Sequence, residues 1–206
     1  GRFARRIALA GKIGIVMANT RPMLPAPGGA EAVVGNNPLA IAVPTGGEPI
    51  VLDLAMSAGA MGKIRLAASK GEPIPEGWAQ TADGLPTRDA AEAIKGVLLP
   101  AAGAKGFGLA VMVDLLAGGL SAGGIGAEVQ PLYGDLSRPY GSANLIMTIE
   151  IEGFRPVADY EAAAAGFADH IRQSKAVPGA APVRLPGDRA VEARRRFDGS
   201  CALAAE

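Results

Sequence analysis

The stretch from Pro49 to Gly71 most constrains how this chain can fold. Residues 49–53 form an apolar run that ends in one acid, Asp53, and small residues follow as far as Gly62. Helical spacing resumes at Lys63. A strand that ends in a carboxylate before a flexible turn and a helix is a place where α/β proteins put ligand-binding groups. The plainer interpretation is that Asp53 caps the turn and Lys63 is a solvated lysine. The pattern alone leaves both open.

The remainder of the chain alternates loosely between strands and helices. Apolar runs predict strands at residues 13–17, 39–43 and 144–150, and 3.6-residue spacing predicts helices at residues 3–10, 160–174 and 191–196. Residues 109–117 are apolar nearly all round, which predicts a buried helix. Residues 19–29 are expected to be a Pro/Gly loop. Because several strands are apolar throughout, we expect an α/β layered domain with a sheet covered on both faces.

Composition excludes several classes of function. Lys plus Arg and Asp plus Glu both number 20 among the 206 residues, so no net positive field favours nucleic acid. No run approaches the ~18 apolar residues of a membrane span. The single cysteine, Cys201, excludes an intrachain disulfide and fits a reducing compartment such as the cytoplasm; we interpret it as an incidental thiol. With one histidine and one cysteine, a metal site of nitrogen and sulfur ligands is not expected.

Three groups of residues could bind or react with a ligand. Residues 103–108, with Lys105 and Gly106, form a Gly-rich approach to a helix that suits a phosphate or carboxylate, although the spacing matches neither a Walker loop nor a dinucleotide fingerprint. The alternative is a flexible helix approach without a ligand. Arginines at 184, 189 and 194–196 are either a solvated face or a grip on a phosphate group. His170, late in a helix, is more often a surface residue than a catalyst.

Many ordered blocks of the sequence match one enzyme family. They are Gly35-Asn-Asn-Pro-Leu-Ala-Ile-Ala-Val-Pro44, Val51-Leu-Asp-Leu-Ala55, Ser57, Gly62-Lys-Ile64, Ile74-Pro-Glu-Gly-Trp78, Asp83-Gly84, Pro86-Thr87, Leu99-Pro100, Lys105-Gly-Phe-Gly-Leu109, Leu132-Tyr-Gly-Asp135 and Pro186-Gly-Asp188. With these blocks the chain resembles the malate/L-lactate dehydrogenase-like family, nearly from end to end.

The resemblance implies a fold, an activity and a cofactor. The implied fold is a three-layer α/β arrangement, not a Rossmann fold, in which helices cover a mixed sheet. The implied activity is NAD- or NADP-dependent hydride transfer to or from a small 2-oxo or 2-hydroxy acid in a homodimer. The implied cofactor contacts are Asp53, Leu54, Ala55, Lys105 and Gly106, with Arg184, Pro186, Gly187 and Arg189 of the extended segment near the C-terminus.

The sequence also departs from the family pattern. Asn36 stands where members usually have a threonine that can contact substrate, so we assign Asn36 and Asn37 to the substrate and leave its identity open. Lys63 is a possible catalytic or carboxylate-binding group. Members carry a further N-terminal part with a Ser-His-Gly motif, whose histidine donates a proton, and an arginine for the substrate carboxylate. No residue here matches either.

Two hypotheses follow. In the first, residues 1–206 are a single NAD(P)-binding domain with an extended tail at 178–206, from an incomplete or split enzyme that requires a separate N-terminal fragment. In the second, the chain is a non-catalytic remnant that binds cofactor or has a structural role.

Overall fold

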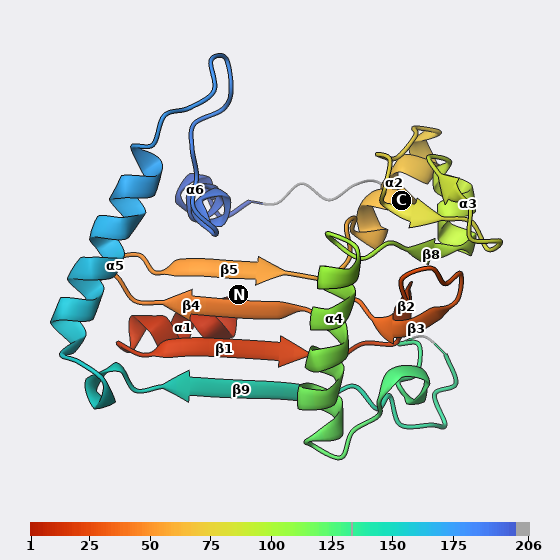
Figure 1. Cartoon of the computed structure of the whole chain (residues 1–206), viewed down its shortest axis with the longest axis horizontal. Helices are drawn as coiled ribbons and strands as arrows, with labels where there is room; N and C mark the ends of the chain where they lie inside the picture. Colours follow the sequence, from red (N-terminus) through yellow and green to blue (C-terminus); the bar gives the residue numbers. More distant parts are fainter. Residues whose placement is uncertain (133, 201–206) are drawn as a thin grey trace. The chain divides into compact units, whose positions relative to one another are not determined.

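The computed structural model describes residues 1–132 and 134–200 (Figure 1). Cys201 and Tyr133 therefore lie outside the described residues. The elements are α1 (Arg2–Leu9), β1 (Ile13–Ala18), β2 (Pro22–Pro25), β3 (Ala32–Gly35), β4 (Leu39–Val43), β5 (Ile50–Leu54), α2 (Met61–Lys70), β6 (Ala79–Gln80), β7 (Pro86–Thr87), α3 (Ala90–Lys95), β8 (Val97–Leu98), α4 (Ala104–Val113), η1 (Asp114–Gly119), η2 (Gly126–Glu128), β9 (Asn144–Ile149), η3 (Ile151–Gly153), α5 (Val157–Arg172) and α6 (Asp188–Arg196). η1 is π-helical and continues directly from α4.

The chain divides into two compact units. Unit 1 comprises residues Gly1–Gly14, Ile41–Asp53 and those from Thr148 onward, and unit 2 comprises Ile15–Ala40 and Leu54–Met147. Strands β5, β4, β1 and β9 are hydrogen-bonded in that order (Figure 1). By residue number, the boundary between the units falls within each of these strands. Each unit is thus assembled from segments that are far apart along the chain. The single NAD(P)-binding domain over residues 1–206 stays a prediction.

Unit 1 contains α1, α5 and α6 and has a small set of buried residues. Ala4 and Ala8 of α1, Ala42 of β4 and Ala168 of α5 are all at most 4% exposed. A Cβ at Gly14 would lie 2.8 Å from the carbonyl oxygen of Ala4, so glycine permits α1 to lie close to the beginning of β1. Small side chains thus bring these backbones close together.

Unit 2 contains the main hydrophobic core. Its buried side chains come from β1, β2, β3, α2, α3, α4 and the segments around β6 and β8; the largest are Leu24, Met56, Ile64, Ile74 and Leu98. Two antiparallel sheets, β2-β3 and β7-β6-β8, belong to this unit. The short helix α3 begins at Asp89, whose carboxylate accepts hydrogen bonds from the amides of Ala91 at 2.7 Å and Glu92 at 3.0 Å.

Three expectations about local structure were wrong. Residues 19–29 contain β2, which pairs with β3 in an irregular register and has a proline at each end, as an edge strand allows. Lys105 and Gly106 are in the first turn of α4 instead of a loop before it. The helix expected to be buried all round buries Ala110, Val113 and Ala117 but leaves Leu109 and Met112 more than half exposed. Composition cannot distinguish a helix covered on all sides from one with an apolar face that the described residues leave open.

Among the residues that the structure describes, no helix has both the length and the apolarity that crossing a membrane requires.

Candidate functional site

An arginine-rich cavity of about 770 Å³ lies in unit 1. We call it the arginine cavity; it is lined by Gly1, Arg2, Arg5, Arg6, Val51, Leu52, Asp53, Pro186, Gly187, Arg189, Ala190, Val191 and Arg194. Asp53 contributes a carboxylate at the end of β5, and its Oδ2 is 2.7 Å from the Gly1 nitrogen. The cavity therefore combines several guanidinium groups with one carboxylate, a set of donors and acceptors that suits phosphates and hydroxyls.

Gly187 allows the segment before α6 to approach β5 closely. Its φ is +91°, and a Cβ at this position would lie 2.8 Å from the carbonyl oxygen of Val51. Any other residue at this position would be strained, both by the left-handed conformation and by the close approach to Val51. Pro186 and Gly187 thus bring the first turn of α6, with Arg189, to the wall that Asp53 also lines.

The beginning of α6 is held by Asp188. Its Oδ2 accepts a hydrogen bond from the Leu185 amide at 2.9 Å, and its Oδ1 accepts one from Arg172 Nη2 at 3.0 Å. The hydrogen bond from Arg172 lowers the pKa of the Asp188 carboxyl below its ordinary value, with a smaller contribution from the Leu185 amide. Because α6 has no buried residue, these polar contacts hold it in place.

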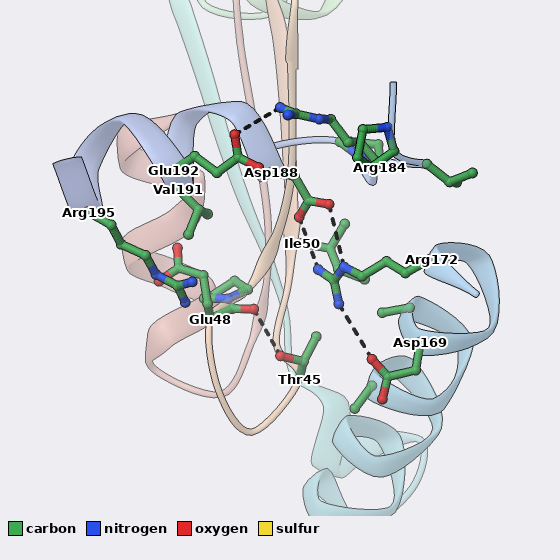
Figure 2. A pocket seen from close by; sticks show the side chains of 16 residues that line it. Thr45, Glu48, Ile50, Asp169, Arg172, Arg184, Asp188, Val191, Glu192 and Arg195 are labelled. Carbon is green, nitrogen blue, oxygen red and sulfur yellow. Dashed lines mark hydrogen bonds and ion pairs between the residues drawn. The ribbon is translucent and has the colours of Figure 1, made fainter. Parts of the chain in front are cut away.

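A second cavity of about 510 Å³ lies against α5, α6 and the β4–β5 turn, and we call it the ion-pair cavity (Figure 2). Figure 2 shows Arg172 between the carboxylates of Asp169 and Asp188, and Arg184 paired with Glu192 at 3.0 Å. Arg184, which the resemblance places at the cofactor, lines this cavity and not the arginine cavity. The polar groups shown here largely satisfy one another.

Glu48 links the two cavities. It lines the ion-pair cavity, and its carboxylate accepts hydrogen bonds from Arg5 Nε and Nη2, both at 2.7 Å, and from Arg194 Nη2 at 2.7 Å. Arg5 and Arg194 line the arginine cavity. The hydrogen bonds from Arg5 chiefly lower the pKa of Glu48, and the Arg194 charge adds to the effect. Glu48 therefore fixes two of the five cavity arginines.

In unit 2, backbone hydrogen bonds connect three of the segments that carry the family resemblance. The Met56 amide donates to the Asn36 carbonyl at 2.8 Å, and the Ala101 amide donates to the Met56 carbonyl at 2.8 Å. The Ala58 amide donates to the Leu99 carbonyl, also at 2.8 Å. We call this meeting of residues 35–37, 54–58 and 99–106 the motif junction.

The two asparagines of the motif junction have different environments. Asn37 is fully buried: its Oδ1 accepts from the Thr20 amide at 2.9 Å and its Nδ2 donates to the Ala110 carbonyl at 2.7 Å. Asn36 is half-buried and its Oδ1 accepts from Thr20 Oγ1 at 3.0 Å. The side chain of Asn37 therefore holds the turn to α4, and Asn36 is the one with exposed surface.

Lys105 and Gly106 begin α4 beside the motif junction. A Cβ at Gly106 would lie 2.1 Å from the Ala101 carbonyl oxygen, so this position requires glycine for packing. Lys105 is exposed in the same turn. Leu54 and Ala55 also belong to unit 2, whereas Asp53 belongs to unit 1. Lys63 is exposed in the first turn of α2.

Sequence analysis missed the arginines of α1. Arg2, Arg5 and Arg6 are spaced i, i+3 and i+4, which places them on one face of the helix. That spacing is visible in the sequence, but no role was assigned to these arginines from it. Their convergence with Arg189 and Arg194 depends on the return of the chain nearly 190 residues later, and no local pattern shows that.

Within residues 1–132 and 134–200, no group of three or more histidine, cysteine, aspartate or glutamate residues is placed to hold a metal ion.

Comparison with known proteins gives consistent matches. A family model described as malate/L-lactate dehydrogenase matches residues 1–199. The malate dehydrogenase of Pyrococcus abyssi is 36% identical over 197 residues, which are 92% of this chain and 54% of the relative. The (2R)-3-sulfolactate dehydrogenase (NADP(+)) of Chromohalobacter salexigens is 36% identical over 205 residues, which are 98% of this chain and 59% of the relative. The chain thus spans little more than half the length of these relatives.

A solved structure supports the same assignment. The sulfolactate dehydrogenase from Methanocaldococcus jannaschii superposes with a TM-score of 0.91 at 29% identity, covering 99% of this chain and 58% of that one. This likeness confirms the predicted α/β fold, in which helices cover mixed sheets. Because the family model matches nearly the whole sequence and the fold agrees, the chain belongs to the malate/L-lactate dehydrogenase family.

Proposed function

We propose that this chain is the cofactor-binding portion of an NAD(P)-dependent oxidoreductase that acts on a small 2-hydroxy or 2-oxo acid. The observation that carries the proposal is the arginine cavity, where Asp53, Gly187 and Arg189, which the family resemblance assigns to the cofactor, meet. The two relatives described above, a malate dehydrogenase and a sulfolactate dehydrogenase, support the substrate class.

The residues of the arginine cavity fit the adenosine and diphosphate portion of such a cofactor. Guanidinium groups pair with phosphate oxygens in two-point contacts, and the Asp53 carboxylate can accept hydrogen bonds from ribose hydroxyls. Gly187, which has no side chain, lets the segment before α6 lie against β5 and so brings Arg189 to the wall that Asp53 lines. When bound, the cofactor supplies the hydride chemistry, and these residues bind and orient it.

The motif junction supplies the other cofactor contacts of the proposal and its substrate contact. We assign Leu54, Ala55, Lys105 and Gly106 to cofactor contacts, because a lysine in the first turn of a helix suits an anion. Asn36 keeps exposed surface and is the better of the two asparagines for substrate contact. We also assign Lys63, exposed in the first turn of α2, to the substrate carboxylate.

Proton supply at the substrate oxygen requires a further group. His170 is the only histidine in the sequence, is exposed on α5, and lines neither cavity of unit 1. We therefore propose that the proton donor and the carboxylate-binding arginine come from outside residues 1–206, from an N-terminal fragment or from the longer protein. By the family resemblance, we also propose a homodimer, and from the single cysteine we propose a reducing compartment such as the cytoplasm.

Calorimetric titration of the chain with NADH and NADPH tests the proposal. We expect binding of at least one of them. NADH binding should weaken roughly tenfold in Asp53→Ala, which removes a contact, and in Gly187→Ala, whose Cβ would meet the Val51 carbonyl oxygen and displace the first turn of α6. Asp83→Ala, an exposed change in unit 2, should leave affinity unaltered. Absence of binding to both cofactors, or variants that bind as the parent chain does, would contradict the proposal.

Turnover separates an enzyme portion from a non-catalytic remnant. NADH oxidation with pyruvate or oxaloacetate should appear only when the chain is mixed with an N-terminal fragment of a full-length relative. Because general acid catalysis contributes ~10²–10⁴-fold, the fragment should restore a rate well above background. Cofactor binding without any restored rate would favour the remnant.

A further inference from the structure

We infer that the arginine cavity selects NADP(H) over NAD(H), and that Arg2, Arg6 and Arg189 bind the additional phosphate monoester. This inference rests on the proposed function, because it specifies which nicotinamide cofactor the same cavity takes.

The arginine cavity is lined by more positive than negative side chains. Five arginines line the cavity, Arg2, Arg5, Arg6, Arg189 and Arg194, against the single carboxylate of Asp53. The diphosphate of NAD carries two negative charges, and a phosphate monoester adds about 1.5 to 2 more near neutral pH. A cavity built for a diphosphate alone would hold more guanidinium groups than its ligand can neutralise.

The five arginines differ in whether a carboxylate already pairs with them. Arg5 and Arg194 are both hydrogen-bonded to Glu48, so their charges are already partly compensated. The guanidinium groups of Arg2, Arg6 and Arg189 make no hydrogen bond or ion pair to any of the residues 1–132 and 134–200. Three uncompensated cations in one cavity match a ligand with more negative charge than a diphosphate.

The three arginines without a carboxylate partner line the cavity from two different helices. Arg2 and Arg6 are one helical turn apart on α1, and Arg189 is in the first turn of α6. They line one cavity from two helices, so a tetrahedral phosphate between the helices can accept from both sides. Arginine is the residue that accommodates the 2′-phosphate of NADP in dinucleotide sites.

Asp53 is the opposing group. A carboxylate that binds ribose hydroxyls favours NAD and repels a 2′-phosphate. The side chain of Asp53 is 58% exposed. Its single, solvent-screened charge is therefore outweighed by the three uncompensated arginines.

Matched pairs of ligands test the inference. We would titrate the chain with NADPH and NADH, and with adenosine 2′,5′-bisphosphate and 5′-AMP, each pair differing only by the 2′-phosphate. We expect the phosphorylated member of each pair to bind roughly tenfold or more tightly, with an advantage that shrinks as salt rises. Arg6→Gln and Arg189→Gln should each remove most of this advantage, because each should lower NADPH affinity more than NADH affinity. Arg155→Gln, an exposed arginine of unit 1 outside both cavities, is the matched control.

The outcomes separate the inference from the proposed function. Equal affinity for both members of each pair, or a preference that survives in Arg6→Gln and Arg189→Gln, overturns the inference while leaving cofactor binding in place. Binding of neither NADH nor NADPH overturns the proposed function, and the inference falls with it.

Discussion

Arg5 of α1 and Glu48 of the β4–β5 turn form a two-point ion pair, with both nitrogen–oxygen distances at 2.7 Å. The two side chains are about 30% exposed, so solvent screens the pair less than a fully exposed one. Arg194 adds a third hydrogen bond to the same carboxylate. One glutamate thus connects α1 to α6, and Arg194 follows Glu48 by 146 residues.

Removing this carboxylate should loosen α6. In Glu48→Gln, Arg5 and Arg194 lose their charged partner, and we expect the free energy of unfolding to fall by about 1 kcal/mol, the upper range for a partly exposed pair. Urea denaturation followed by circular dichroism measures the change. Lys95→Gln, which breaks an exposed i,i+3 pair with Glu92, is the control and should cost less. Equal effects in the two variants would show that Glu48 is an ordinary surface residue.

Acid should weaken the attachment of α6. The pKa values of Glu48 and Asp188 are lowered in the folded chain, chiefly by hydrogen bonds from Arg5 and Arg172. A carboxylate with a depressed pKa stabilises the fold above its unfolded pKa and loses that contribution as pH falls through the folded value. Stability should therefore decline below about pH 4.5, the ordinary value for Glu48.

Hydrogen exchange of the α6 amides between pH 7 and pH 3, corrected for intrinsic rates, measures this decline. The double variant Glu48→Gln/Asp188→Asn should show a shallower decline than the parent chain. If protection of α6 is unchanged by pH in the parent, the carboxylates do not hold the helix.

Two glycines of α4 should respond oppositely to alanine. A Cβ at Gly106 would meet the Ala101 carbonyl oxygen at 2.1 Å, whereas a Cβ at Gly108 has nothing within 4 Å. Gly106→Ala should destabilise the chain by about 2–4 kcal/mol, and Gly108→Ala should stabilise it by about 0.5–1 kcal/mol through helix propensity. Thermal unfolding of both variants checks the pair. A mild effect at Gly106 would mean that the turn before α4 can move aside.

Lys105→Met should weaken cofactor binding. The change keeps a long side chain and removes the charge, so we expect a loss of roughly 1.5–3 kcal/mol, the range for a charged hydrogen bond. Titration with the cofactor that binds the parent chain more tightly measures it. Lys70→Met, at the exposed end of α2, is the control. Unchanged affinity in Lys105→Met would remove this lysine from the site.

The sequence predicted the elements of this fold better than it predicted their exposure. Apolar runs located β1, β4, β5 and β9, but β5 and β9 contain no buried residue. The inference from apolarity to burial also failed for α4, where Leu109 and Met112 are exposed although the helix is apolar. Hydrophobicity shows that a surface favours burial, but it does not show which part of the chain covers that surface.

The candidate site was predictable only where local pattern or family motif marked it. Asp53 stood out as an acid at the end of an apolar strand, and Pro186 and Gly187 matched a family segment. Arg2, Arg6 and Glu48 carry no motif. Their roles arise from the meeting of α1, α6 and the β4–β5 turn, which is a property of tertiary packing and not of neighbouring residues.

The assembly of unit 1 from three separate stretches has a consequence for evolution and engineering. The arginine cavity is not encoded by any short segment of the gene. Its residues come from α1, the end of β5 and the beginning of α6, which lie in three separate stretches of the sequence. A single recombination crossover between relatives would therefore pair an α1 from one parent with an α6 from the other. Exchange of cofactor preference within this family should thus proceed by point substitution and not by transfer of a whole module.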